Sequence, residues 1–217
     1  MGSVVPVGEF KSIDNGAFDA GFAETGFTLS FDGDYYLHNR FAVTGRFYFG
    51  MSGINEAESY QWLKNNLGSY FIEDSVRTTI GFWQWSAPMV GMKYNYPVVL
   101  NKLYIETGIF SGLNITPIPA LQMKVIDDTN KRIVYSENIL KNSFSVPLMA
   151  DAAIRIIFNQ NMQLKLHAGY YQAKTKHQHV SYYLNENAET ITEELSKTDF
   201  NVPIKAINLG VGFIYTL

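Results

Sequence analysis

The sequence predicts an all-β fold, an eight-stranded antiparallel up-and-down transmembrane β-barrel that forms a single domain over residues 1–217. Three observations lead to this prediction. The last eleven residues form an apolar strip with a period of 2, seven further segments share that period, and long connections alternate with short ones along the chain. Together these features are typical of a β-sheet that closes on itself within a membrane.

The C-terminal strip alternates most clearly. Its apolar residues at every second position are Ile207, Leu209, Val211, Phe213, Tyr215 and Leu217. A period of 2 places these side chains on one face of a strand and leaves mostly small or polar residues on the other. A soluble protein rarely exposes so long an apolar strip, whereas a transmembrane barrel turns such a face towards lipid. We expect this strand to close the barrel and to serve as its assembly strand.

Four predicted strands occupy the amino-terminal half of the chain: residues 4–10, 26–37, 41–51 and 77–94. The first is short. The second and third alternate because apolar and aromatic residues recur at every second position, as at Phe27 and Phe31 or at Phe47 and Phe49. In the fourth, the apolar parity changes near Ser86-Ala87-Pro88, which predicts a β-bulge there.

The other four predicted strands are residues 102–115, 144–158, 162–174 and 207–217. Each has one apolar face and one face with charged or small residues. Ile105 and Ile109, for example, share a parity that excludes Glu106, and Leu164 and Leu166 flank Lys165. This alternation is typical of a strand with two different environments on its two faces.

The connections differ in length in a regular way. Three are short, namely residues 38–40, 95–101 and 159–161, and four are long, namely 11–25, 52–76, 116–142 and 175–202. In an up-and-down barrel this alternation puts all long loops at one end, as in outer-membrane barrels with long extracellular loops. An even strand number puts both termini on the periplasmic side. Within the second long loop we expect a helix over residues 55–67, capped by Asn55.

Composition narrows the function classes. The chain is 15% aromatic and 17% charged, carries a net charge of -3 and has no cysteine. Mean hydropathy is -0.07, and no run reaches the roughly 20 apolar residues of a membrane helix. The small net charge and the lack of a basic stripe argue against nucleic acid as a partner. The lack of cysteine excludes thiolate chemistry. No signal-peptide pattern precedes the first strand, and we expect residues 1–3 to be a cloning remnant in its place.

The polar faces of the predicted strands carry a balanced set of charges. We expect these residues to form a structural charge network in the lumen: Asp32, Asp34, Arg46, Glu106, Asp151, Arg155, Lys165 and His167. Buried charges need partners to offset desolvation, and eight strands leave an interior that side chains fill, with no open channel. The alternative is a soluble lipocalin-like barrel, in which these charges face water and the apolar face lines a ligand cavity.

Several further residues are candidates for chemistry, and for each a structural role is the preferred interpretation. His167 is the candidate base of a lipid A-modifying enzyme, His177 and His179 form a pair that could bind a metal, and Asp127 and Asp128 resemble part of a calcium loop. Asn130 could add a calcium ligand beside Asp127 and Asp128, and Glu186 or Glu189 a metal ligand beside the two histidines. Lys205 could contact lipid phosphates. The aromatic residues of the long loops could contact a partner protein: Tyr60, Trp62, Tyr70, Tyr182, Tyr183 and Phe200. We therefore expect no enzyme, metal or cofactor.

Three segments resemble a known family: residues 4–10 (VVPVGEF), 21–27 (GFAETGF) and 31–41 (FDGDYYLHNRF). The chain resembles the outer-membrane β-barrel domain proteins of the Bacteroidetes type, which are similar in architecture to the small OmpA/OmpX-type barrels. The resemblance implies an eight-stranded barrel in the outer membrane of a Gram-negative bacterium. Leu217 departs from it, since many such barrels end in phenylalanine.

The function we expect is that of a structural or adhesive anchor that presents four long extracellular loops. Its expected partners are outer-membrane lipid and lipopolysaccharide, the barrel-assembly machinery during insertion, and an extracellular ligand that the sequence does not identify.

Overall fold

The computed structural model describes residues 1–11, 21–59, 77–100, 102–117, 119, 121–127, 132–138, 142–159, 161–184 and 191–215. Within these ranges the chain is almost entirely strand. The helical residues among those described form a 3-10 helix, η1 (Gly8–Phe10), and a helical turn at residues 56–59. Asn55 accepts a hydrogen bond from the backbone N–H of Glu58 at 3.1 Å, as an N-cap does. The remainder of the predicted helix over 55–67 lies outside the described residues.

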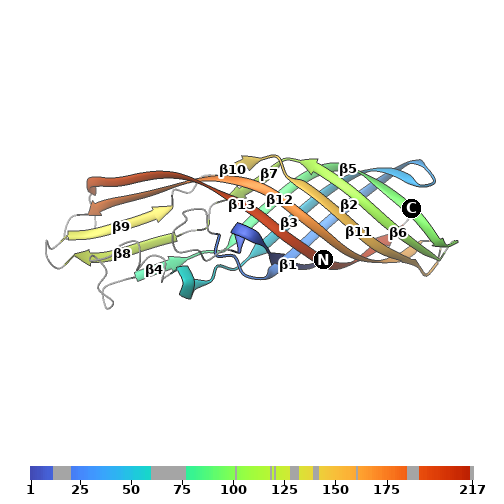
Figure 1. Ribbon diagram of the computed structural model, residues 1–217, viewed down its shortest axis with the longest axis horizontal. Helices are drawn as coiled ribbons and strands as arrows, with labels where there is room; N and C mark the ends of the chain where they lie inside the picture. The colour runs from blue at the N-terminus through green and yellow to red at the C-terminus, as the bar shows by residue number, and fades with distance from the viewer. Residues whose placement is uncertain are drawn as a thin grey trace.

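Eight strands form a ring (Figure 1). In order around it they are β1 (Gly2–Pro6), β2 (Gly26–His38), β3 (Phe41–Ser52), β5 (Trp83–Val99), β6 (Leu103–Gly112), β11 (Leu148–Ile157), β12 (Met162–Leu184) and β13 (Ile191–Tyr215). Each pairs antiparallel with the next, and β13 pairs antiparallel with β1. The predicted all-β, antiparallel, up-and-down arrangement is confirmed, and the sheet is barrel-like.

The same sheet continues beyond one end of the ring (Figure 1). There β12 and β13, 23 and 25 residues long, continue beyond the ring, and β9 (Arg132–Asn138), β8 (Leu121–Asp127) and β4 (Arg77–Ile80) pair beside them in the order β13-β12-β9-β8-β4. β7 (Asn114–Pro117) and β10 (Asn142–Ser145) pair with each other at the same end. We call it the loop end. The opposite end, with the short connections from β2 to β3 and from β5 to β6, is the turn end.

Much of two predicted long connections, 116–142 and 175–202, is therefore strand and not loop. In 116–142, the alternation of Leu121, Met123 and Val125 with polar residues in β8 was overlooked. In 175–202, polar residues occupy both parities, as in the run Lys174-Thr175-Lys176. Such a segment shows no apolar period of 2, although a partner strand can still supply all its backbone hydrogen bonds. The sequence pattern alone therefore ended these strands too early.

Three finer predictions are also wrong. The predicted first strand, 4–10, stops at Pro6, because η1 follows and Gly8 has φ +59°. No bulge occurs near Ser86-Ala87-Pro88 against β3, since the register runs unbroken along β5. Every second residue from Trp83 to Lys93 points inward. The predicted change of parity was wrong because it treated Trp83 and Trp85 as outward-facing residues. The predicted strands 77–94, 102–115 and 144–158 are each divided in two.

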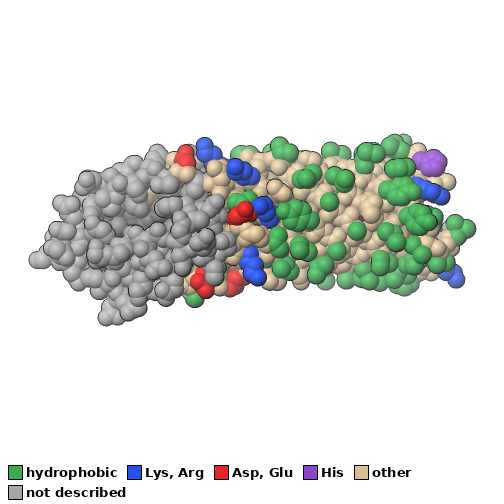
Figure 2. Space-filling view, viewed as in Figure 1, with side chains coloured by type: hydrophobic (Ala, Val, Ile, Leu, Met, Phe, Trp, Pro, Cys, Tyr) green, Lys and Arg blue, Asp and Glu red, His purple; other side chains and the backbone are tan. Residues whose placement is uncertain are grey.

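The two faces of the ring differ sharply. Large apolar side chains point outward and are exposed, whereas polar and aromatic side chains fill the interior. Figure 2 shows hydrophobic side chains along the ring on the visible face, with charged side chains gathered at its two ends. Among the described residues, no helix has the length and hydropathy needed to cross a membrane.

Candidate functional site: the interior of the ring

Arg46 connects three strands across the interior. From β3 it donates hydrogen bonds through Nε and Nη2 to the two carboxylate oxygens of Asp32 on β2, at 2.8 and 2.7 Å. Its Nη1 donates to Asp151 Oδ2 on β11 at 2.6 Å. The guanidinium also lies 3.8 Å from the centroid of the Phe110 ring on β6. Paired contacts of this kind offset the desolvation of a buried guanidinium.

Glu106 on β6 is the centre of a second cluster. It is fully buried and accepts a hydrogen bond from Lys165 Nζ on β12. Lys93 Nζ lies 3.8 Å from its Oε1, and Arg155 Nη1 lies 3.6 Å from its Oε2. Three cations from three strands thus surround one carboxylate.

Lys93 on β5 joins the two clusters. Besides its contact with Glu106, its Nζ donates to Asp32 Oδ2 and to Asp34 Oδ1, each at 2.8 Å. Thr44 also donates a hydrogen bond to Asp34, at 2.7 Å. Sequence analysis missed Lys93, although the outward parity of its neighbours Met92 and Tyr94 was a sufficient signal.

The completed network balances its charges. It contains four carboxylates and four cations: Asp32, Asp34, Glu106, Asp151, Arg46, Lys93, Arg155 and Lys165. Seven of these residues belong to the set predicted from sequence, and the structure brings those seven together. Because every pair joins different strands, the network can fix how the strands sit relative to one another.

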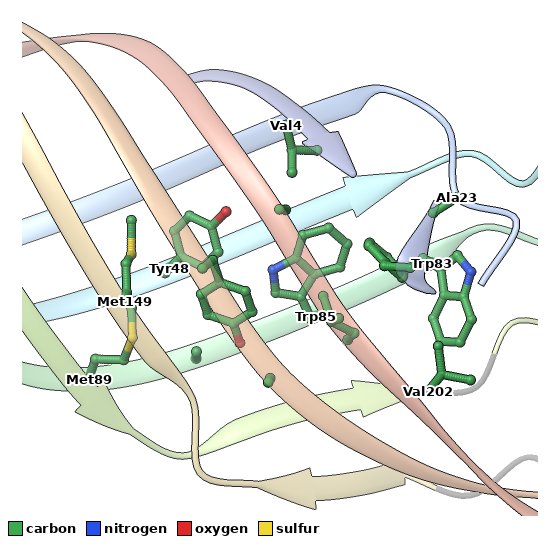
Figure 3. Close-up of a cluster of buried hydrophobic side chains, with 14 of the residues drawn as sticks. Val4, Ala23, Tyr48, Trp83, Trp85, Met89, Met149 and Val202 are labelled. Carbon is green, nitrogen blue, oxygen red and sulfur yellow. The ribbon is translucent and has the colours of Figure 1, made fainter. Parts of the chain in front are cut away.

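Aromatic side chains fill the half of the interior nearer the loop end (Figure 3). Tyr48 and Tyr171 stack with ring centroids 5.0 Å apart, and Trp85 stacks on Tyr171 at 6.2 Å. Phe10 of η1 meets Trp83 and Trp85 edge to face, at 5.5 and 5.8 Å. Sequence analysis expected a polar lumen throughout, so this aromatic layer is a correction.

The two buried tyrosine hydroxyls of the aromatic layer each have a hydrogen-bond partner. Tyr48 donates its hydroxyl hydrogen to Asn208 Oδ1 at 2.6 Å, and Tyr171 donates to Asn114 Oδ1 at 2.7 Å. A buried hydroxyl without a partner would be costly. The two asparagines lie on β13 and β7, so these bonds tie the stacked rings to two different strands of the wall.

His167, the eighth predicted network residue, lies beside the ion pairs on β12. It lines the same cavity as Asp32, Lys93 and Lys165. Its register partner on β13 is Gly210, and a Cβ built on Gly210 would lie 2.4 Å from His167 Nε2. The absence of a side chain at position 210 therefore makes room for the imidazole.

Gly210→Ala is expected to lower the free energy of unfolding by about 1–3 kcal/mol, because the new methyl group overpacks against His167 and the Met1 carbonyl. Gly212→Ala is the matched control, since the nearest atom to its Cβ, Lys165 Cβ, is 3.9 Å away. Urea titrations of both variants check this. Equal stability of the two would show that His167 does not occupy this position.

Lys205 lies near the loop end of the ring, where the exposed apolar side chains of its outer face end. Its Nζ donates to Glu9 Oε2 at 2.6 Å, and this hydrogen bond lowers the pKa of the exposed Glu9 carboxyl. Lys174 and Lys176 on β12 are exposed near it. These three lysines could meet anionic head groups where an apolar surface ends.

Other candidates lie outside the residues or side chains that the structure describes. For His177, His179, Asp127, Tyr182, Tyr183 and Phe200 it describes the backbone alone; Tyr60, Trp62, Tyr70, Asp128, Asn130, Glu186, Glu189 and Leu217 lie outside the described ranges. Among the described residues, no group of three or more histidines or carboxylates could hold a metal ion.

No protein-family model, no curated protein and no solved structure matches this chain.

Proposed function

We propose that the ring is a transmembrane β-barrel in the outer membrane of a Gram-negative bacterium. One observation carries the proposal: the side chains are distributed the opposite way from those of a soluble protein. The outward residues include Phe31, Phe47, Val90, Met92, Ile109, Leu166, Leu209 and Phe213, each more than two-fifths exposed, whereas Glu106, Arg46 and Lys93 are buried inside. Lipid is the solvent that matches such an outer face.

Strand length supports the same proposal. β6 and β11 each contain 10 residues, and a tilted transmembrane strand needs about 9–11. A lipocalin-like barrel would instead place apolar residues inside and charges outside. The inverted arrangement favours the membrane protein over this alternative.

The role we propose is that of a structural or adhesive anchor. The ring interior is packed with charged and aromatic side chains, which favours an anchor over a conducting pore, and planar-bilayer recordings should show no stepwise conductance. The sheet that continues from β12 and β13 would be presented outside the cell. We propose outer-membrane lipid and lipopolysaccharide as partners, with Lys174, Lys176 and Lys205 near their phosphates. We also propose that the barrel-assembly machinery recognises β13 during insertion.

We propose no enzymatic activity. A lipid A-modifying enzyme is the alternative, with His167 as its base. His167 faces the interior beside Lys165 and away from the apolar outer surface. Incubation with lipid A should therefore leave the lipid unchanged, and activity that His167→Ala abolishes would contradict this part of the proposal.

The experiment that tests the proposal is expression with an export signal, followed by Sarkosyl fractionation and SDS-PAGE with and without boiling. We expect the protein in the Sarkosyl-insoluble membrane fraction. We also expect a heat-dependent mobility shift, because a closed barrel stays compact in SDS until it is heated. A soluble monomer without a shift would refute the membrane location.

Ile109→Arg tests the direction of the outer face directly. Ile109 is 65% exposed and lies between Ile105 and Leu113 along β6 and its continuation. In a bilayer this change should cost about 2–4 kcal/mol, whereas at an exposed site in water it would cost less than about 0.5 kcal/mol. Val98→Arg, near the turn end, is the matched control and should cost about 0–1 kcal/mol. Urea titrations in lipid vesicles measure both; equal effects would contradict the membrane orientation.

A further inference from the structure

The turn end of the ring is a cationic surface in the part of the chain that the structure describes. Outside the interior network, its exposed ionisable side chains of this kind are His38 and Arg40, between β2 and β3, and Lys102, between β5 and β6. Neither connection contains an aspartate or a glutamate, and residues 157–163, which join β11 to β12, contain no charged residue. Figure 2 shows basic and histidine side chains at this end of the visible face, without acidic ones among the described residues.

The loop end differs because it carries exposed charges of both signs. Lys205 pairs with Glu9 at 2.6 Å, and Lys176 Nζ lies 3.9 Å from a carboxylate oxygen of Asp199. Glu24 is exposed at this end as well. The loop end therefore balances part of its positive charge with carboxylates of the protein itself.

The two permanent cations of the turn end have fixed backbones and exposed side chains. The carbonyl of Arg40 accepts a hydrogen bond from the Asn95 N–H at 2.8 Å. The N–H of Lys102 donates to the Val99 carbonyl at 3.0 Å, and the Lys102 carbonyl accepts from Ile157 at 2.9 Å. The ion pairs among the described residues include neither cation. Their charges are thus available to a partner outside the chain.

Both cations stand where the apolar outer face of the ring ends. On β3 that face begins with Phe41, which is 44% exposed, and Arg40 directly precedes it. On β6 it begins with Leu103, and Lys102 directly precedes it. The rings of Phe41 and Tyr94 lie 4.9 Å apart at this edge. Aromatic and long basic side chains suit the level of lipid head groups, because each combines an apolar body with a polar tip.

We propose that the turn end binds the head groups of anionic phospholipids through Arg40 and Lys102. The loop end outside the cell would place the turn end in the periplasmic leaflet, so this proposal rests on the proposed function. A zwitterionic head group carries its own cation, whereas an anionic one leaves its phosphate charge to a partner. A guanidinium can donate two parallel hydrogen bonds to a phosphate, and an ammonium group meets it as a point charge.

The exposed apolar residues beside the cations favour a lipid over a soluble acidic partner. Tyr96 is 53% exposed, Val98 49% and Leu100 74%, all in or next to the connection from β5 to β6. A soluble anion would neutralise the cations and leave these side chains in water. A phospholipid covers both kinds of surface at once, because its acyl chains lie directly beneath its phosphate.

The test measures which lipid lies beside the turn end. Tyr96→Trp places a fluorescent reporter on β5 between Asn95, which is bonded to Arg40, and Val99, which is bonded to Lys102. The full-length protein is reconstituted into phosphatidylcholine vesicles that contain a minor fraction of brominated phosphatidylglycerol, and bromine quenches nearby tryptophan. The signal of protein without the reporter is subtracted. The local share of phosphatidylglycerol should exceed its share in the bilayer at least about three-fold, whereas brominated phosphatidylcholine should show no enrichment.

Two sets of charge variants assign the enrichment to the turn end. Arg40→Gln combined with Lys102→Gln should abolish it, and so should high salt, which screens exposed charges. Lys11→Gln removes an exposed lysine beyond η1 at the loop end and should leave the enrichment unchanged.

The proposed function and this proposal can fail separately. The measurement uses only protein that has inserted into vesicles and shows the heat-dependent mobility shift, so a failure to insert would contradict the proposed function. Inserted protein that shows no enrichment of phosphatidylglycerol would overturn this proposal. Enrichment that persists in the double variant, or that Lys11→Gln reduces equally, would overturn it as well.

Discussion

Replacing Glu106 with glutamine is expected to lower the free energy of unfolding by about 3–5 kcal/mol, because it leaves buried cations without their counter-charge. Glu106 is fully buried and lies among Lys93, Arg155 and Lys165. Glutamine keeps the shape of the side chain, so the loss would come from charge and not from packing. The midpoint of the heat-modifiable gel shift in a urea series measures it in lipid vesicles.

Two controls accompany Glu106→Gln. Glu9→Gln removes the same charge from an exposed pair with Lys205 and should produce no resolvable change, since exposed ion pairs contribute little. The double variant Glu106→Gln with Lys165→Met should recover part of the loss, because it removes one of the cations left unpaired. If Glu106→Gln were as stable as the wild type, water would have to reach the network.

Trp85→Ala is expected to cost about 3–5 kcal/mol through the cavity that it leaves in the aromatic layer. Trp85 is fully buried, meets Phe10 edge to face and stacks on Tyr171. Its indole also fills the space over Gly50, where a Cβ would come within 2.2 Å of the ring. The same gel-shift midpoint in urea gives the size of the loss.

The complementary change tests the same contact from the other strand. Gly50→Ala should cost about 1–3 kcal/mol by overpacking against the indole. In the background of Trp85→Ala, Gly50→Ala should be close to neutral, because the ring it would strike is absent. Additive losses in the double variant would mean that the two positions do not touch.

The strands of the ring could be predicted because each has two contrasting faces. The predicted 26–37 and 41–51 differ from β2 and β3 by one residue at one end. Where both faces carry polar residues, as at Lys174-Thr175-Lys176, the pattern disappears although the strand continues. A period of 2 in the sequence arises only where the two faces of a strand have different environments. Backbone hydrogen bonding between strands does not by itself produce such a pattern.

The interior of the ring could likewise be predicted only in part. The inward parity of Arg46, Glu106 and Lys165 could be read from their apolar neighbours. Which carboxylate meets which cation could not be predicted, because the contact of Arg46 with Asp151 depends on the registers of three successive pairings, β3 with β5, β5 with β6 and β6 with β11. The aromatic layer escaped prediction because Trp83 and Trp85 look like lipid-facing residues in the sequence, and only their burial in the structure distinguishes them.

The contact between Met1 and Val211 joins residues 210 positions apart. Since β1 is the first strand of the ring to be made and β13 the last, the ring cannot close until β13 has been synthesised. Until then β1 lacks one of its two neighbouring strands, and the outward apolar faces are not yet part of a closed ring. Pairing over such sequence distances is slow, so the chain must be kept from aggregating for longer than a protein whose contacts are local. Loss of the last strand should therefore abolish folding as a whole and leave no stable smaller ring.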